Sequence, residues 1–208
     1  MKHSHVDVPE HMKHLKMNDT GYFTPWFVEG DDFRIVDGKK AGLAVTKKAC
    51  WICGLPYEKE EYALVGDPLT AMFRVAKEPP CHLDCATYAM QVCPFILYPN
   101  AKRRTAGLPV EKTLEYTNRD RKIKILEDNP GEFYIIVLND FKYHHNKQVM
   151  TFSEKNVIER QYWIGGKRQE THPNPIVPWE KVPESYKRLV KATQMKQKAA
   201  KARQQTSR

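Results

Sequence analysis

Four residues of this 208-residue chain have the types and the spacing of a metal-binding set. Cys50 and Cys53 form one pair with two residues between them, and His82 and Cys85 form a second such pair. A Cys-x-x-Cys turn lets two thiolates converge on one ion, and ligands three residues apart share one face of a first helical turn. Together the two pairs can complete a tetrahedron. The sequence therefore predicts a structural Zn²⁺ site at Cys50, Cys53, His82 and Cys85.

The identity of one of the four ligands is open, because Cys81 lies next to His82. Cys81 and Cys85 are four residues apart, so Cys81 could replace His82 as ligand and leave His82 as a neighbouring hydrogen-bond donor. We favour His82, because two pairs of equal spacing make the simpler site. Cys93, two turns further along the predicted helix, is interpreted as a small core residue.

The segments around the two pairs predict a knuckle, a hairpin and a ligand-bearing helix, in the order of a treble clef. The hairpin is expected from two strand-like runs, residues 61–65 and 72–75, on either side of the turn signal Gly66-Asp67-Pro68. Residues 82–92 then have helical spacing. Loss of the ion is expected to unfold this region, because structural zinc contributes directly to folding.

The remaining elements complete a prediction of an α+β fold with a small antiparallel sheet. Residues 39–48 suit a short helix before the first cysteine pair. The nearly continuous apolar run at residues 133–138 indicates a buried central strand. We expect residues 121–126 to pair with it in antiparallel fashion, and weaker strands at residues 149–152 and 161–164.

The chain is expected to have three parts. Residues 1–20 form a flexible, solvated arm, residues 21–180 a zinc-stabilised α+β domain, and residues 181–208 a basic helix or tail. Trp26 and Phe27 are expected to anchor the arm onto the domain. The arm holds half of the eight histidines of the chain, at positions 3, 5, 11 and 14.

The net charge of +9 is concentrated at the C-terminal end. Residues 181–208 contain nine basic residues and one acid, Glu184, whereas the rest of the chain is close to neutral. Such a tail is typical of contacts to phosphates, which are salt-dependent and indifferent to sequence. The residues expected to bind nucleic acid are Lys187, Arg188, Lys191, Lys196, Lys198, Lys201 and Arg203.

Composition and motifs exclude several classes of protein. No apolar run approaches the ~20 residues of a membrane helix, and the first residues lack the apolar core of a secretory signal, so we expect a cytoplasmic protein without membrane contact. The cysteine spacing is that of a metal site rather than of a disulfide framework. The His-x-Glu or Cys-x-Glu element of zinc deaminases is absent, and so is the His-Glu-x-x-His motif of metalloproteases.

A metal-dependent nuclease of the HNH type is the strongest enzymatic alternative, because it is also built on a treble clef. It needs a histidine that activates water, and the candidates are His144 and His145, followed by Asn146. In that class the histidine lies between the ligand pairs, but residues 54–80 contain no histidine. A site with four protein ligands also leaves no open position for a substrate. The sequence therefore does not support an enzyme.

Four short motifs resemble those of an uncharacterised family of bacterial and phage proteins. They are Pro25-Trp26-Phe27, Cys50-Trp51-Ile52-Cys53-Gly54, Pro79-Pro80-Cys81-His82-Leu83-Asp84-Cys85 and Cys93-Pro94-Phe95. The resemblance covers about residues 24–180 and implies Cys50, Cys53, His82 and Cys85 as ligands, since the position of Cys81 is often not cysteine in the family. The basic tail departs from the pattern, and no established activity comes with the family.

These observations predict a zinc-stabilised cytoplasmic protein that associates with nucleic acid or a nucleoprotein complex through its basic tail. The alternative is a protein–protein interaction module, such as a phage-encoded inhibitor of a host machine, which the resemblance and the many aromatic side chains favour. A host protein is the partner in that case.

Overall fold

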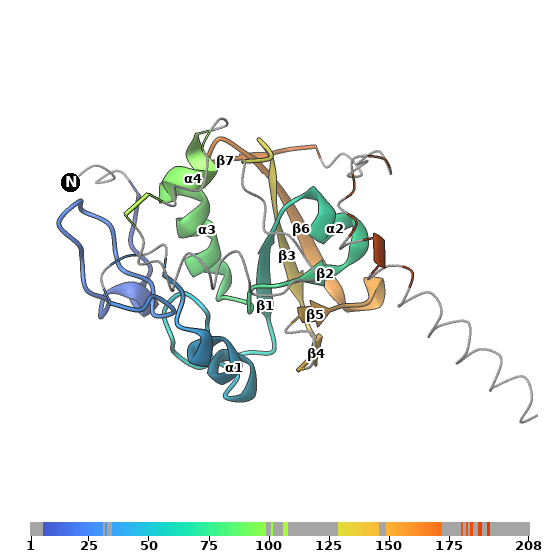
Figure 1. Ribbon diagram of the computed structural model, residues 1–208, viewed down its shortest axis with the longest axis horizontal. Coiled ribbons are helices and arrows are strands. Elements are labelled where there is room, and N and C mark those ends of the chain that lie inside the picture. Colours follow the sequence, from blue (N-terminus) through green and yellow to red (C-terminus); the bar gives the residue numbers. More distant parts are fainter. Residues whose placement is uncertain are drawn as a thin grey trace, which may run out of the picture. The chain divides into compact units, whose positions relative to one another are not determined.

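The computed structural model describes residues 6–30, 32, 35–98, 101, 106, 107, 129–145, 149–171, 180, 182, 184, 187, 188 and 191. The chain divides into two compact units, residues 1–104 with 127–176 and residues 105–126 with 177–208. From the sequence, residues 21–180 are expected to form one domain. The fold described below is that of the first unit (Figure 1).

Helices and short antiparallel strands alternate along the chain, as expected for an α+β fold. The elements are η1 (Glu10–Met12), α1 (Gly38–Thr46), β1 (Tyr62–Gly66), α2 (Pro68–Phe73), β2 (Val75–Ala76), α3 (Leu83–Val92), α4 (Pro94–Leu97), β3 (Phe133–Leu138), β4 (Lys142–His144), β5 (Val149–Thr151), η2 (Glu154–Asn156), β6 (Val157–Ile164) and β7 (Lys167–Gln169). No helix among the described residues has the length and apolar character needed to cross a membrane.

The strands form two antiparallel sheets, a larger one of order β1-β3-β6-β7 and a smaller one of order β2-β5-β4. Every residue of β3 is buried, which confirms the predicted central strand. Its neighbours are β1, where Tyr62 pairs with Leu138, and β6, where Trp163 pairs with Phe133. The expected pairing with residues 121–126 is therefore wrong, and those residues lie outside the described part of the chain.

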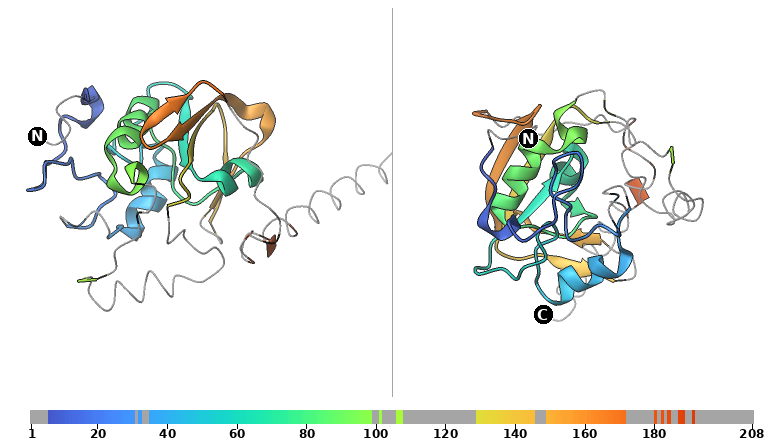
Figure 2. Two further views of the ribbon diagram at one scale, coloured as in Figure 1. Left: turned by 90° about the horizontal axis from the view of Figure 1, so that it is seen from above. Right: turned by 90° about the vertical axis from the view of Figure 1, so that its left-hand side faces the viewer.

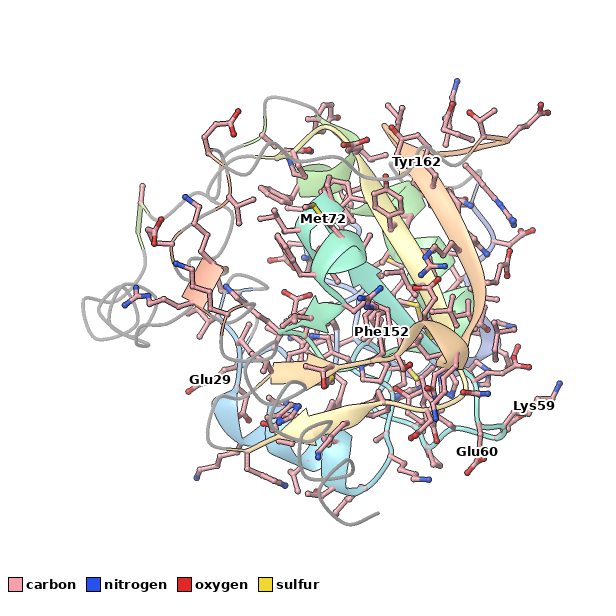
Figure 3. The ribbon with its side chains drawn as sticks, turned by 90° about the vertical axis from the view of Figure 1, so that its right-hand side faces the viewer. Glu29, Lys59, Glu60, Met72, Phe152 and Tyr162 are labelled. Carbon is pink, nitrogen blue, oxygen red and sulfur yellow. The ribbon has the colours of Figure 1, made fainter. Side chains whose placement is uncertain are left out.

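Alternate side chains of β3 enter two separate cores, as the two-residue period of a strand requires. Phe133, Ile135 and Val137 belong to the core that includes α3, whereas Ile136 and Leu138 belong to the other core. Helix α3 lies on one side of the larger sheet and α2 with the smaller sheet on the other (Figure 1). Figure 3 looks onto α2, which lies in front of the strands of the larger sheet.

The hairpin predicted between the two ligand pairs is not formed. After β1 the chain enters α2, because the Asp67 carboxylate accepts the amide hydrogen of Thr70 (2.6 Å) and Pro68 occupies the first helical turn. Strand β2 is only two residues long and pairs with β5, while β1 pairs with β3. The part of a treble clef that a β1–β2 hairpin would supply is thus replaced by a strand–helix–strand unit.

The N-terminal segment differs from the expected solvated arm. Met12 is only 3% exposed and belongs to the same core as the cysteines. The expected anchor is present, since the Trp26 amide donates to the Ile52 carbonyl (2.7 Å) and the Phe27 ring stacks on that of Trp51 at 4.7 Å. Residues 6–20 run along the same side of the larger sheet as α3 (Figures 1 and 2), and residues 1–5 lie outside the described part.

Candidate metal centre

Cys50 and Cys53 lie in a tight loop between α1 and β1. The Cys50 amide donates to the Leu55 carbonyl (2.8 Å), and the Gly54 amide donates to the Cys50 carbonyl (2.8 Å). Gly54 has a φ of 78°, which glycine adopts at little cost. The loop is thereby closed on itself, and both cysteines are buried inside the unit.

The second pair lies at the start of α3. His82 is the N-cap residue of this helix, and Cys85 lies in its first turn. Backbone hydrogen bonds hold this segment against its neighbours: the Trp51 amide donates to the Pro80 carbonyl (2.9 Å), and Ala63 of β1 exchanges two bonds with Cys81 (2.8 and 2.9 Å). The cysteine loop, β1 and the helix start therefore form one connected body.

The structure brings the four predicted ligands together. One ligand atom from each of Cys50, Cys53, His82 and Cys85 lies within 4.8 Å of the others, and all four residues are buried. Nδ1 of His82 is 3.3 Å from Sγ of Cys53 and 3.9 Å from Sγ of Cys85. These four groups could hold a metal ion. Four protein donors fill a tetrahedral coordination sphere, which is the arrangement of a structural site.

Backbone amides favour the thiolate form of Cys50. Its sulfur accepts the amide hydrogens of Cys53 (3.5 Å) and His82 (3.3 Å), and donors that point at a sulfur favour its charged form. Burial raises the pKa of Cys50, but the hydrogen bonds from the neighbouring thiols of Cys53 and Cys81 outweigh it and hold the pKa well below its usual range. At least one ligand is thus ready to bind a cation.

The ring of His82 is fixed with Nδ1 toward the sulfurs. Its Nε2 lies 3.1 Å from the Pro56 carbonyl oxygen, so Nε2 carries a hydrogen that it donates and Nδ1 is left as the ligand atom. A backbone acceptor on the far nitrogen is the usual support of a metal-binding histidine. The ring of Tyr57 meets that of His82 edge-on at 5.0 Å, and the ring of His11 stacks on it at 4.3 Å.

Between the two candidates that the sequence left open, the structure places His82 in the cluster. Cys81 is buried beside Cys50, and its hydrogen bond to Cys50 raises its pKa, but its sulfur is not one of the four clustered ligand atoms. Its backbone is committed to the pairing with Ala63. Cys93, predicted as a core residue, is half-buried at the C-terminal end of α3 and is not part of the cluster either.

A second group of metal-type side chains consists of His11, His82 and Asp84. It shares His82 with the first group, and both nitrogens of that ring are already engaged. The rings of His11 and His82 are stacked, with their planes inclined by 16°. In this arrangement neither ring turns the edge that carries its nitrogen atoms toward the other ring. His11 Nε2 lies 3.6 Å from the Asp84 carboxylate. This group is therefore the surroundings of the first site rather than a separate one.

The contacts of His11 and His14 with the centre are not predicted by the sequence. Besides the stacking of His11, Nε2 of His14 lies 3.0 Å from the Cys53 carbonyl oxygen and donates to it. Several histidines within a polar N-terminal segment were the available signal, but neither has a ligand-like spacing to the two pairs.

The other predicted site residues lie elsewhere. Nε2 of His144 is 2.8 Å from Oγ1 of Thr151, and the His145 ring packs against Tyr143. Neither histidine belongs to a group of potential metal ligands within the described part of the chain.

The described residues of the basic tail are partly consistent with a helix. Glu184, Lys187, Arg188 and Lys191 have helical conformations. Lys187 forms an ion pair with Glu184 (2.9 Å), and Arg188 and Lys191 are exposed. Four further predicted contacts, Lys196, Lys198, Lys201 and Arg203, lie outside the described residues.

Comparisons of the chain with protein-family models, with curated proteins and with solved structures find no match. The resemblance to bacterial and phage proteins therefore stays a prediction. The functional interpretation rests on the metal-ligand cluster and on the charge of the tail.

Proposed function

We propose that the chain is a zinc-stabilised binding protein that associates with nucleic acid or a nucleoprotein complex through its basic C-terminal tail. The observation that carries the first half is the buried cluster of Cys50, Cys53, His82 and Cys85. A set of three thiolates and one imidazole matches the donor preference of Zn²⁺. Harder ions such as Mg²⁺ and Ca²⁺ prefer oxygen ligands and do not suit it.

The second half of the proposal is supported by the distribution of charge. The tail carries nine basic residues against one acid, and Arg188 and Lys191 are exposed. Phosphate contacts from such a tail release counterions, so affinity falls steeply with salt. In this proposal the zinc-held unit is the stable body and the tail makes the electrostatic contact.

The zinc half is tested by elemental analysis of protein purified without added metal. One equivalent of zinc per chain is expected. A Cys50→Ser variant is expected to lose the ion and to melt at a lower temperature, by about 10 °C or more, because structural zinc contributes several kcal/mol to folding. A protein that folds with no bound metal would contradict this half.

The nucleic-acid half is tested with two variants of equal charge change. The tail variant carries Lys196→Gln, Lys198→Gln, Lys201→Gln and Arg203→Gln. The control variant carries the same kind of change at four exposed lysines of the body, Lys39, Lys47, Lys142 and Lys167.

We expect the tail variant to lose affinity for a random-sequence DNA or RNA duplex at low salt. The slope of log affinity against log salt should shrink by about 0.9 for each phosphate that the tail no longer neutralises. The control variant should bind like the unmodified protein. Equal losses in both variants would indicate unspecific charge attraction and would remove the tail from the proposal.

A further inference from the structure

The described part of the chain has an open groove of about 810 Å³ beside the metal centre. It is lined by the N-terminal segment from Val6 to Pro9 together with His11, and by Glu58, Lys59 and Glu61 of the loop before β1. It is also lined by His82 and by residues of α3 from Leu83 to Gln91. The groove therefore reaches a ligand of the centre directly.

His82 is the ligand through which the centre is closest to solvent. It is 9% exposed, whereas Cys50, Cys53 and Cys85 are exposed by no more than 1%. His82 is also one of the residues that line the groove. The shortest path for an ion that leaves the centre, or for a chelator that approaches it, therefore passes the His82 side chain.

Residues 6–16, which we call the N-terminal cover, lie along the groove and hold the His82 ring in place. The His11 ring stacks on the His82 ring at 4.3 Å, and His14 donates to the carbonyl oxygen of the ligand Cys53 (3.0 Å). Between these two contacts, Met12 is buried in the core that contains the cysteines. The cover thus touches both ligand pairs, although it supplies no ligand.

We propose that the N-terminal cover gates the metal centre, so that the contacts of His11 and His14 set the rate at which the ion is exchanged through the groove. The ion exchanges when the cover lifts, because the stacked His11 ring must separate from His82 before His82 can swing away. Four acidic residues, Asp7, Glu58, Glu61 and Asp84, and one basic residue, Lys59, line the groove. Its charge is negative on balance, and negative charge of this kind raises the local concentration of cations. The inference rests on the proposed zinc site.

The test uses the full chain loaded with Zn²⁺ and an excess of a chromogenic chelator, with the release rate as the readout. The variants are His11→Ala, His14→Ala and their combination. His11→Phe keeps a stacking ring, and His145→Ala is the matched control, since that histidine packs on Tyr143 instead of the centre. Circular dichroism before the challenge shows whether each variant is folded.

We expect the double variant to release zinc about three- to tenfold faster than the unmodified protein, because it lacks one stacked ring and one hydrogen bond. His145→Ala should release it at the unmodified rate. His11→Phe keeps the stacking ring but loses the contact with Asp84, so it should release the ion more slowly than His11→Ala. If the double variant is not folded, the two single variants are compared with the unmodified protein instead. Each is expected to release zinc faster than the unmodified protein, by a smaller factor than the double variant.

An unchanged release rate in a folded variant that lacks His11 and His14, or in both single variants, would overturn the gate. This outcome is distinct from failure of the proposed zinc site, in which the unmodified protein itself would hold no stoichiometric ion before the chelator is added.

Discussion

Gly54 lies so close to the indole ring of Trp26 that a Cβ atom at this position would be 2.5 Å from Cγ of the tryptophan. The backbone of Trp26 cannot move away easily, because its amide donates to the carbonyl of Ile52 within the cysteine loop. The tryptophan therefore fixes the loop from the outside, and the absence of a side chain at Gly54 is a condition for that contact.

Gly54→Ala is expected to destabilise the protein by about 2–5 kcal/mol, from the positive φ and the steric overlap together. Gly30 offers a matched control: its φ of 69° is similar, but a Cβ there would meet nothing within 4 Å. Gly30→Ala should cost about 1–2 kcal/mol, from the backbone alone. Chemical denaturation measures the free energy of unfolding of both variants. Equal losses of stability in the two variants would refute the role of Trp26.

Replacement of His82 separates the ligand role of this residue from its role in the helix start. His82→Cys supplies a thiolate at the same position and is expected to retain one metal ion, whereas His82→Ala should lose it, unless Cys81 moves in. The double variant His82→Ala with Cys81→Ser removes that possibility. Cobalt(II) absorption measures the outcome, because the intensity of sulfur charge-transfer bands rises with the number of thiolate ligands. Unchanged bands in His82→Cys would exclude His82 as a ligand.

Metal affinity is expected to increase with pH. Burial lowers the pKa of His82, but its hydrogen bonds to Cys50 and Cys53 and the charge of these residues outweigh it and raise the pKa to about 10 in the ion-free chain. At neutral pH the ring is therefore protonated before the ion binds, and Nδ1 must release its proton. Affinity should rise by about tenfold per pH unit for each proton released. Chelator competition at several pH values below 10 measures this, and a flat profile would contradict it.

The cluster of four potential metal ligands could be predicted from the sequence because the geometry of each pair is local. Two residues between Cys50 and Cys53, and again between His82 and Cys85, bring each pair together in a single turn. Strand β3 could also be predicted, since a run of six consecutive apolar residues is typical of a strand that is buried on both faces. The sequence could not show which strands lie beside β3, because those pairings join distant parts of the chain.

The prediction of a hairpin between the ligand pairs is wrong because the same residues are typical of both a turn and a helix start. Asp67-Pro68 is common in turns, but aspartate followed by proline is also typical of a helix start, and the Asp67 side chain caps α2. Residues 6–16 carry no comparable signal. Their conformation depends on contacts with the centre and not on a helical or strand-like periodicity of their own. For this reason the sequence of this polar, histidine-containing segment predicts a solvated arm.

The pairing of Ala63 with Cys81 makes β1 a shared edge of the larger sheet and of the metal centre. A chain without the proposed ion is expected to lose support at this edge, and the effect should reach β3 through the strand pairing. Proteases act on such opened chains in proportion to their population. If the proposed ion is bound, the cellular abundance of the protein is therefore expected to follow the supply of that metal, independently of any change in its synthesis.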